Sequence, residues 1–473
     1  MKSAVAVRRI DPPHYPSVSP FDPPNPVYAA VVGLLELLGL DRERVGTPQW
    51  NPFGPWVRPG GSVVLKPNFV TNRDREKLLV GDELVASSTH PAVLRPLIDL
   101  GWRALQGRGT ITVVDSPIEG SDIEDTRARL GFDRMVAELQ ARGVEVRWLD
   151  LRDFSYRRHF LLDDVRLAGR SLNLGWLEHR SQAGDPRGYT TIDVGAQSLL
   201  HELPHRERLA FHKRDYRVAA RMHADGSHPY SFANTVLDAD LVVNVPKLKT
   251  HKKSGVTLAL KSVIGLSNRK IWMPHFRRGW APWGDEYDRK PHLGERIGNR
   301  LTRFPVWGGH SVVLNCPRLG APPVLAEGGG HPGNETLWRT ILDLNVAFLY
   351  GKRDGTLADH PQRRVLHVVD GIVGGEGEGP LRATPRRAGV LVAAFDPVAV
   401  EAVGAECMGF DSRALPTVTQ AGRTSPHVLG RGDLEHIELL GDGLVPSAPP
   451  FRPARFWEHL AHPVARSRSP LPT

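Results

Sequence analysis

The hydrophobic pattern of the chain is dominated by five short apolar runs, which are rich in valine, isoleucine and leucine and show no regular polar alternation. Runs of this kind are typical of strands that are buried on both faces of a parallel sheet. They cover residues 62–65, 111–114, 241–245, 365–369 and 389–395.

Helix-like stretches separate several of these runs. Residues 91–105 follow the first run, residues 122–142 follow the second with a break near Gly131, and residues 397–408 follow the last. Asp396 and Pro397 suit the cap and the first turn of that third helix. The alternation predicts an α/β fold with a mostly parallel sheet and helices on both faces.

Two long segments interrupt the alternation and predict insertions that form an irregular or second lobe. Residues 150–233 are rich in arginine and histidine, and residues 268–309 contain four tryptophans among prolines and glycines. We expect the second segment to fold over a site, and simple packing of its tryptophans is the alternative. We therefore divide the chain into an extension with an amphipathic helix (1–61), an α/β domain with the two insertions (62–433), and a partly disordered extension (434–473).

The first residues, the longest apolar stretch and the two cysteines together favour a cytoplasmic protein. Residues 1–28 are rich in proline and charge and lack the apolar core of a signal peptide. The longest apolar stretch, residues 27–40, is interrupted by Glu36 and is too short to span a bilayer. Cys316 and Cys407 lie far apart, which excludes a disulfide framework, a cysteine-only zinc site and an iron–sulfur cluster.

The formal net charge of +9 favours acidic partners. The excess is spread along the chain and is mostly arginine, with no block of five or six like charges. Nucleic acid is therefore an unlikely partner, and an anionic small molecule is the expected one.

Polar or charged residues follow each of the five apolar runs. In open α/β sheets the loops at the carboxyl ends of parallel strands meet at one edge, where ligands bind. The sequence therefore predicts one crevice that collects these residues. They are Lys66-Pro67-Asn68, Asp115-Ser116-Pro117, Pro246 to His251, Asp370-Gly371 and Asp396-Pro397.

Each of these groups also has a simpler interpretation. Asp396 before proline suits a helix cap, and Asp115 before Ser116 suits a turn. Lys66 and Asn68 suit a solvated strand end, since lysine is mostly exposed. The shared-crevice interpretation rests on the coincidence of all five.

Residues 244–265, NVPKLKTHKKSGVTLALKSVIG, carry the strongest chemical signal. In an extended chain Lys247, Lys249 and His251 project to the same side, and Lys261 follows on an apolar helix-like run. Clustered ammonium groups bind phosphate or carboxylate oxygens, and their crowding lowers a lysine pKa toward neutrality. A solvated basic loop or a nucleic-acid patch is the alternative.

Residues 370–380, DGIVGGEGEGP, combine glycines with acids after a strand. The run has neither a GxGxxG fingerprint nor a Walker lysine, so it does not indicate nucleotide binding. Asp370 and Glu376 could hold a divalent cation that bridges to an anionic substrate, and a flexible turn is the alternative. The twenty histidines show no spacing typical of zinc ligands.

The run LVVNVPKLKTHKKSGVTLALKSVIG resembles the hallmark of the domain-of-unknown-function 362 family, and further matches follow in family order from Ser62 to about Asp433. Some members of that family carry a ferredoxin-like cysteine cassette, which this chain lacks, so a redox role does not transfer. Members without the cassette often occur beside carbohydrate or cell-envelope genes. The chain departs from the family at Ser262, where an asparagine is common. The other matches are VVLKPNFV at Val63, STHP at Ser88, VVDSP at Val113, VLDADLVVNVP at Val236, WMPHF at Trp272, GDEY at Gly284, DLN at Asp343, DGIVGGEGEGP at Asp370 and FDPVAVEAVGAECMGF at Phe395.

Taken together, these residues favour an enzyme that acts on a phosphorylated or carboxylated small molecule, such as a sugar derivative. The alternative is a non-catalytic binding or accessory module. Any cofactor is unknown beyond the divalent cation considered at Asp370 and Glu376. The expected catalytic residues are Lys249, His251, Lys261 and Asp115, and the expected substrate-binding residues are Lys66, Asn68, His90, Lys247, Trp272 and His275.

Overall fold

The computed structural model describes residues 2–16, 21–23, 25–71, 73–74, 77–118, 120–167, 170–211, 216–292, 310–315 and 328–461. Trp307, Cys316, the second part of the 268–309 insertion and the end of the expected disordered tail lie outside these residues. Within the described ranges, no helix has both the length and the apolar character that crossing a bilayer requires.

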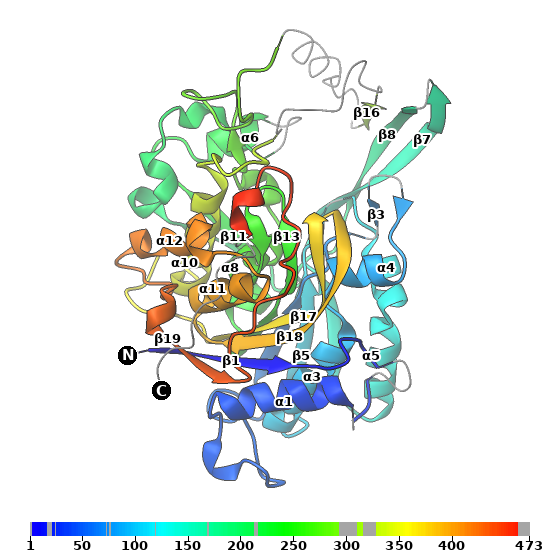
Figure 1. The fold of residues 1–473 in the computed structure, drawn as a ribbon, viewed down its shortest axis with the longest axis vertical. Coiled ribbons are helices and arrows are strands. Elements are labelled where there is room, and N and C mark those ends of the chain that lie inside the picture. Colours follow the sequence, from blue (N-terminus) through cyan, green and yellow to red (C-terminus); the bar gives the residue numbers. More distant parts are fainter. Residues whose placement is uncertain are drawn as a thin grey trace.

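The centre of the molecule is a ten-stranded sheet (Figure 1). Neighbouring strands along its main path run parallel, except that β18 runs antiparallel to both of its neighbours. Two further strands, β13 (Lys247–His251) and β14 (Gly255–Thr257), extend the sheet beside β17. The path is β19 (Ile437–Gly441), β1 (Ser3–Arg9), β18 (Arg382–Ala394), β17 (Val365–Glu378), β12 (Leu241–Val245), β2 (Ser62–Pro67), β5 (Thr110–Asp115) and β6 (Val146–Asp150).

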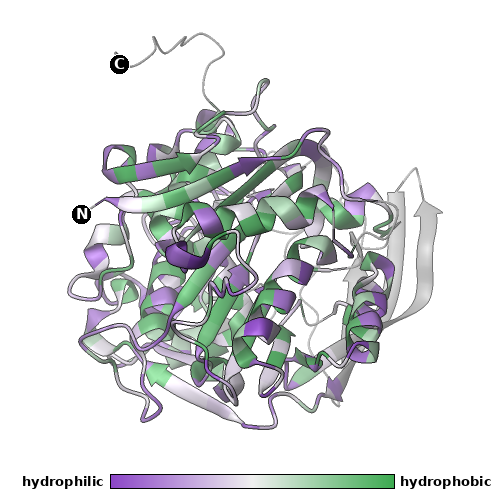
Figure 2. Cartoon of the chain, turned by 90° about the horizontal axis from the view of Figure 1, so that it is seen from below, coloured by the Kyte–Doolittle hydropathy of each residue, from purple (hydrophilic) through white to green (hydrophobic). Residues whose placement is uncertain are grey.

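Helices cover both faces of this sheet, which confirms the predicted fold class. Alternate side chains of one strand point into different layers: Val63 and Leu65 pack in one hydrophobic cluster and Val64 in the other. Burial on both faces explains the continuous apolar runs, and Figure 2 shows the central strands in green with purple on the surrounding helices and loops. One cluster includes α1 (Pro26–Leu37), α3 (Pro91–Leu105) and α5 (Phe132–Ala141), and the other includes α8 (Ala259–Ser262), α10 (Leu337–Tyr350) and α11 (Pro397–Cys407).

The predicted helices are confirmed with nearly the expected bounds. Residues 122–142 form α4 (Ile123–Leu130) and α5, and Gly131 between them has a φ of 76°. That left-handed conformation favours glycine, which explains the break. At α11 the Asp396 side chain accepts hydrogen bonds from the amides of Val398 and Ala399, as a helix cap does.

The prediction that all five strand ends share one edge is wrong for the fifth. Strand β18 is antiparallel to β17, and its Ala394 lies beside His367 near the start of β17. Asp396 therefore lies at the opposite edge of the sheet, and the helix-cap interpretation is the correct one there. The run of glycines and acids after Asp370 also differs from the expected loop, because it continues β17 as far as Glu378.

Both ends of the described chain add strands to the same sheet. Strand β1 lies between β18 and β19, so residues 3–9 and 437–441 close one side of the α/β domain (Figure 1). Strands of the 150–233 insertion lie in small separate sheets, two of which also include a strand from a later segment, β15 or β16. These are β7 (Phe154–Leu167) with β8 (Arg170–Ser181) and β16 (His310–Asn315), β9 (Tyr189–Asp193) with β11 (Pro229–Ala233), and β10 (Leu209–Ala210) with β15 (Phe276–Arg277).

Candidate functional site

The carboxyl ends of four neighbouring strands bring the predicted lysines together. Lys66 at the end of β2 lies beside Asn244 of β12, and Lys247 on β13 lies beside Asp370 of β17. Strand β5 follows next to β2 and ends at Asp115. The side chains of Lys66, Lys247 and Lys249 are all completely buried.

The first element of the site is the ion pair between Lys66 and Asp115. The Lys66 Nζ lies 3.2 Å from Asp115 Oδ1 and donates to the Pro67 carbonyl (2.8 Å) and to Ser262 Oγ (3.2 Å). These three oxygens match the three protons of an ammonium group. Burial lowers the pKa of Lys66, and the charge of Asp115 partly offsets that effect.

Asp115 is itself fixed by the backbone. Its carboxylate accepts hydrogen bonds from the amides of Phe69 (2.7 Å) and Ser116 (2.9 Å). A Cβ atom at Gly265 would lie 2.3 Å from Asp115 Oδ1 and 2.6 Å from Lys66 Nζ. Only glycine leaves room for the pair at this position, so the pair and the backbone of residue 265 are packed as a unit.

The second element is the ion pair between Lys247 and Asp370, 3.0 Å apart and completely buried. The Tyr15 hydroxyl bridges it, because it accepts from Lys247 Nζ (2.8 Å) and donates to Asp370 Oδ1 (2.5 Å). The amide of His90 also donates to Asp370 (2.8 Å), and the rings of Tyr15 and His90 stack with centroids 3.9 Å apart. Burial raises the pKa of Tyr15 well above its usual value and lowers that of His90 to about 3.

Lys249 differs from both of these lysines. Its Nζ donates to the Ser87 carbonyl, and among the described residues no carboxylate lies within ion-pair distance. Burial lowers its pKa well below the usual value, and the charges of Lys247 and Lys66 lower it further. Lys249 is therefore a buried amine that favours its neutral form.

Lys261 is a second amine without a carboxylate partner in the described part of the chain. It is half-buried on α8, and burial together with the charge of Lys270 lowers its pKa to about 7. The nearest compensating acid is Glu401 of α11, whose own pKa burial raises to about 8. Sequence reasoning missed Glu401, because its position in an apolar helix suggests only packing.

His251 lies beside Lys261 and is 7% exposed. Its Nδ1 accepts from the Lys253 amide (3.0 Å), which leaves the proton of a neutral ring on Nε2. Burial lowers its pKa well below the usual value, and the charges of Lys261 and Lys253 act in the same direction. His275, whose charge also acts on His251, has its Nδ1 3.0 Å from the Met273 carbonyl.

Several buried polar atoms near the lysines have no hydrogen-bonding partner among the described residues. Asn68 directly follows β2, which carries Lys66, and Ser116 directly follows β5, which carries Asp115. Thr257 pairs with Lys249 in the sheet. A buried polar group without a partner costs about 1–3 kcal/mol, so such a group indicates a place for water or a ligand. The atoms are Asn68 Oδ1, Ser88 Oγ, Ser116 Oγ and Thr257 Oγ1.

The residues considered for a cation do not come together. Asp370 holds Lys247 and Tyr15, whereas Glu376 accepts a hydrogen bond from the Arg452 amide (3.0 Å). They stand six residues apart on β17, which is roughly 20 Å at the usual strand rise. Among the described residues, no group of three or more histidine, cysteine or acidic side chains could hold a metal ion. A cation bound by both acids at once does not fit this arrangement.

Trp272 closes the short 3₁₀ helix η6 (Lys270–Trp272) and is half-buried. Its carbonyl lies 2.7 Å from His223 Nε2, so its backbone is anchored to the 150–233 insertion. Beside it, Lys270 donates to the carbonyls of Ser116 and Pro117. Lys270 thus ties the start of the aromatic segment to the end of β5, next to Asp115.

A family model named "Domain of unknown function (DUF362)" matches residues 63–174 and 180–406. The chain belongs to the DUF362 family. This confirms the resemblance seen in the lysine motif, and the DUF362 match includes Lys66, Asp115, Lys249 and Lys261. Tyr15 lies outside the DUF362 match although it completes the second ion pair.

One curated relative is the thylakoid-associated protein sll1697 of Synechocystis. It is 23% identical over 200 residues, which cover 42% of this chain and 42% of the relative. No solved structure matches the chain. These similarities establish the family and leave the chemistry of the site to be inferred from its geometry.

Proposed function

We propose that this protein is an enzyme that binds a phosphorylated or carboxylated small molecule at the lysine cluster, meaning Lys66, Lys247, Lys249 and Lys261. The observation that carries the proposal is the pair of amines, Lys249 and Lys261, that lack a carboxylate partner in the described structure. If all four lysines are charged, the two ion-paired aspartates balance two of them. Glu401, whose pKa is about 8, is mostly neutral at pH 7 and leaves the other two charges without a counterion. An anionic ligand would supply the missing negative charge.

The two ion pairs and the two unpaired amines have different roles in this proposal. Lys66 has three oxygen neighbours already, so it positions Asp115 rather than offering protons to a ligand. Lys261, which is half-buried, would meet the ligand first, and Lys249 would bind its oxygens in the interior. The unpartnered hydroxyls of Ser88, Ser116 and Thr257 would donate further hydrogen bonds.

The lowered pKa values support acid–base chemistry. Lys261, whose pKa burial lowers to about 7, could exchange a proton with the bound substrate, since an acid or base acts best when its pKa is close to the working pH. His251 Nε2–H, which has no partner among the described residues, would donate or relay a proton beside Lys261. A non-catalytic binding module would share the anion site without this proton transfer.

A ligand panel tests the proposal. We would measure thermal unfolding with inorganic phosphate, glucose 6-phosphate and malonate for the wild type, for Lys249→Met and for Lys352→Met. Lys352 is an exposed lysine on another part of the surface, 3.2 Å from Asp354, and it serves as a matched control. We expect an anion to raise the melting temperature of the wild type and of the control, and to have little effect on Lys249→Met.

Equal stabilisation of all three proteins would contradict the lysine site. Compounds that bind would then be incubated with the wild type and with Lys249→Met, and the mixtures followed by mass spectrometry. Conversion by the wild type alone supports an enzyme. Binding without conversion of any phosphorylated or carboxylated compound favours the binding module.

A further inference from the structure

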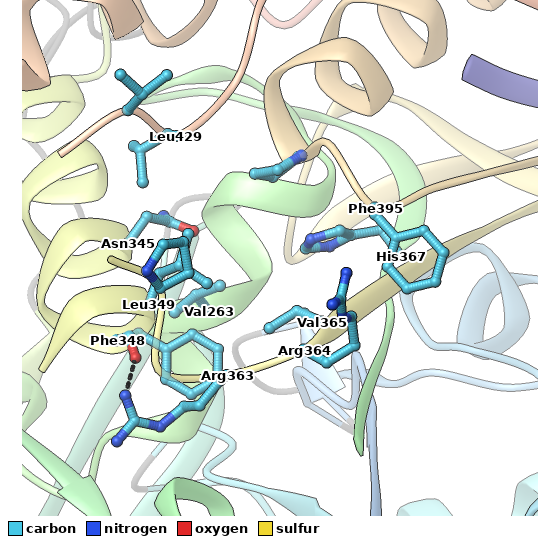
Figure 3. A pocket seen from close by; sticks show the side chains of 13 residues that line it. Val263, Asn345, Phe348, Leu349, Arg363, Arg364, Val365, His367, Phe395 and Leu429 are labelled. Carbon is cyan, nitrogen blue, oxygen red and sulfur yellow. Dashed lines mark hydrogen bonds between the residues drawn. The ribbon is translucent and has the colours of Figure 1, made fainter. Parts of the chain in front are cut away.

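A cavity of about 220 Å³ lies at the opposite edge of the sheet from the lysine cluster (Figure 3). Its walls come from the start of β17, the end of β18, helix α10 and the 3₁₀ helix η5 (Val263–Leu266). Most of its lining is apolar, and it contains two arginines, one histidine and one asparagine with no acidic residue. The polar members are Asn345, Arg363, Arg364 and His367.

The basic groups differ in how far they are already engaged. Arg363 is buried and donates to the carbonyls of Leu237, Phe348 and Gly351, so it is largely committed to the protein. The side chain of the exposed Arg364 has no hydrogen bond or ion pair in the described residues. Its guanidinium lies 5.8 Å from the ring centre of Phe395, another residue of the lining (Figure 3).

His367 provides a polar group in the interior of the cavity. It is 2% exposed, and its Nδ1 lies 3.1 Å from Asn244 Nδ2. An amide nitrogen donates, so Nδ1 is the acceptor and the proton of the neutral ring is on Nε2. Nε2–H has no partner among the described residues and can donate to a ligand oxygen. Figure 3 shows His367 and Arg364 on the same side of the cavity.

We infer that this cavity is a binding site for a small carboxylate with an apolar body, about the size of one aromatic ring. A cavity of roughly 150 Å³ accepts benzene, so the volume here fits a ring with one substituent. The ring would pack on Phe348, Val365 and Phe395, and the carboxylate would accept from Arg364 and from His367 Nε2–H. The positive charge of the lining and the absence of lining acids exclude a cationic ligand.

The site is distinct from the lysine cluster, although the two are neighbours across one short helix. Asn345 Nδ2 donates to the Leu260 carbonyl (3.0 Å), and Val263 of the lining follows directly after Lys261 and Ser262. An anion could therefore bind in the cavity or at the lysine cluster, so the experiment needs one variant that affects each place alone.

We would titrate benzoate and benzyl alcohol, an uncharged compound of similar shape, and follow binding by saturation-transfer NMR. Arg364→Gln removes the charge, and Val428→Trp fills the cavity from a lining position that is 59% exposed, so both variants should fold. The reference is the affinity of benzoate for the wild type. We expect benzyl alcohol to bind the wild type about tenfold more weakly than this, and benzoate to bind Arg364→Gln about tenfold more weakly as well. Val428→Trp should lose binding, and Lys249→Met should keep it.

Arg147→Gln on the edge strand β6, whose side chain is 61% exposed, is the control and should bind benzoate normally. Loss of benzoate binding in Lys249→Met would overturn the proposal, because it would place the ligand in the lysine cluster. Equal binding of the two compounds, unchanged binding by Val428→Trp, or no binding of benzoate at millimolar concentration would overturn it as well.

Discussion

The two edges of the central sheet differ in how they hold positive charge. At the carboxyl edge, Lys66 and Lys247 are completely buried and each is paired with a buried aspartate. At the amino edge, Arg364 is exposed and lies against the rings of Trp56 and Phe395, with no carboxylate partner among the described residues. A buried ammonium group requires a counterion, whereas an exposed guanidinium is stabilised by water. Changes to charge should therefore have large effects at the first edge and small effects at the second.

The largest effect is expected for Asp370→Ala. It leaves Lys247 buried without its partner and removes the acceptor of the Tyr15 hydroxyl and the His90 amide. We expect the free energy of unfolding in urea to fall by about 3–5 kcal/mol. Lys352→Met, which breaks the exposed pair between Lys352 and Asp354, should lower the free energy of unfolding far less. Similar losses in the two variants would remove the contrast between buried and exposed charge.

The pH dependence of stability provides the next test. The pKa of Lys261 is about 7 in the folded protein and 10.5 in the unfolded chain, so between these values the unfolded chain binds more protons. Stability should then rise with pH from 8 to 10, by up to about 1.4 kcal/mol per pH unit from this group. Glu401 has a pKa of about 8 in the folded protein, so it changes the pH dependence of stability mainly below pH 8.

The measurement is urea unfolding at pH 8, 9 and 10 for the wild type, Lys261→Met and Lys352→Met. We expect a shallower rise for Lys261→Met and the wild-type slope for Lys352→Met. Equal slopes in all three proteins would mean that Lys261 keeps an ordinary pKa in the folded state.

A smaller effect is expected for Tyr15→Phe, which keeps the stacked ring and removes only the bridging hydroxyl. Loss of its hydrogen bonds to two charged groups should lower the free energy of unfolding by about 1–3 kcal/mol. Tyr28→Phe is the control, because the Tyr28 hydroxyl donates to Asp99 over 3.2 Å in a less buried position. A loss for Tyr15→Phe no greater than the loss for Tyr28→Phe would argue against the bridge.

The smallest effect is expected for Arg364→Gln at the amino edge. Arg364 is exposed and has no ion pair in the described residues, so the free energy of unfolding should change by less than about 0.5 kcal/mol. Urea unfolding provides the value. A loss comparable to that of Asp370→Ala would show that charge contributes equally to stability at the two edges.

Local patterns predicted the strands and helices well because both have short-range signals. The apolar runs at residues 62–65 and 241–245 became β2 and β12, and Pro91–Leu105 became α3 with its predicted bounds. Strand direction is not visible in an apolar run itself but in the connection between two runs, so the reversal of β18 was missed. In retrospect, no helix-like stretch lies between β17 and β18, and a parallel connection needs a crossover of a dozen or more residues.

The site was predicted unevenly for the same reason. Lys66, Lys247, Lys249 and Asp115 follow or extend apolar strands, and the strand pattern alone placed them at one edge. The partners that distinguish the lysines from one another come from remote segments. Tyr15 is 355 residues from Asp370, and Glu401 acts on Lys261 from helix α11, far along the chain from α8. No local pattern in the sequence reports such contacts.

Proton uptake on ligand binding shows whether the lysine cluster lacks negative charge until an anion binds. We would titrate inorganic phosphate at pH 8 by calorimetry in buffers of different ionisation enthalpy, using the wild type, Lys249→Met and Lys352→Met. We expect the wild type and Lys352→Met to take up protons as phosphate binds, because lysines with a lowered pKa become charged beside the anion. Lys249→Met should bind more weakly and take up fewer protons. Phosphate binding without proton uptake, or unchanged binding by Lys249→Met, would show that the cluster does not lack negative charge.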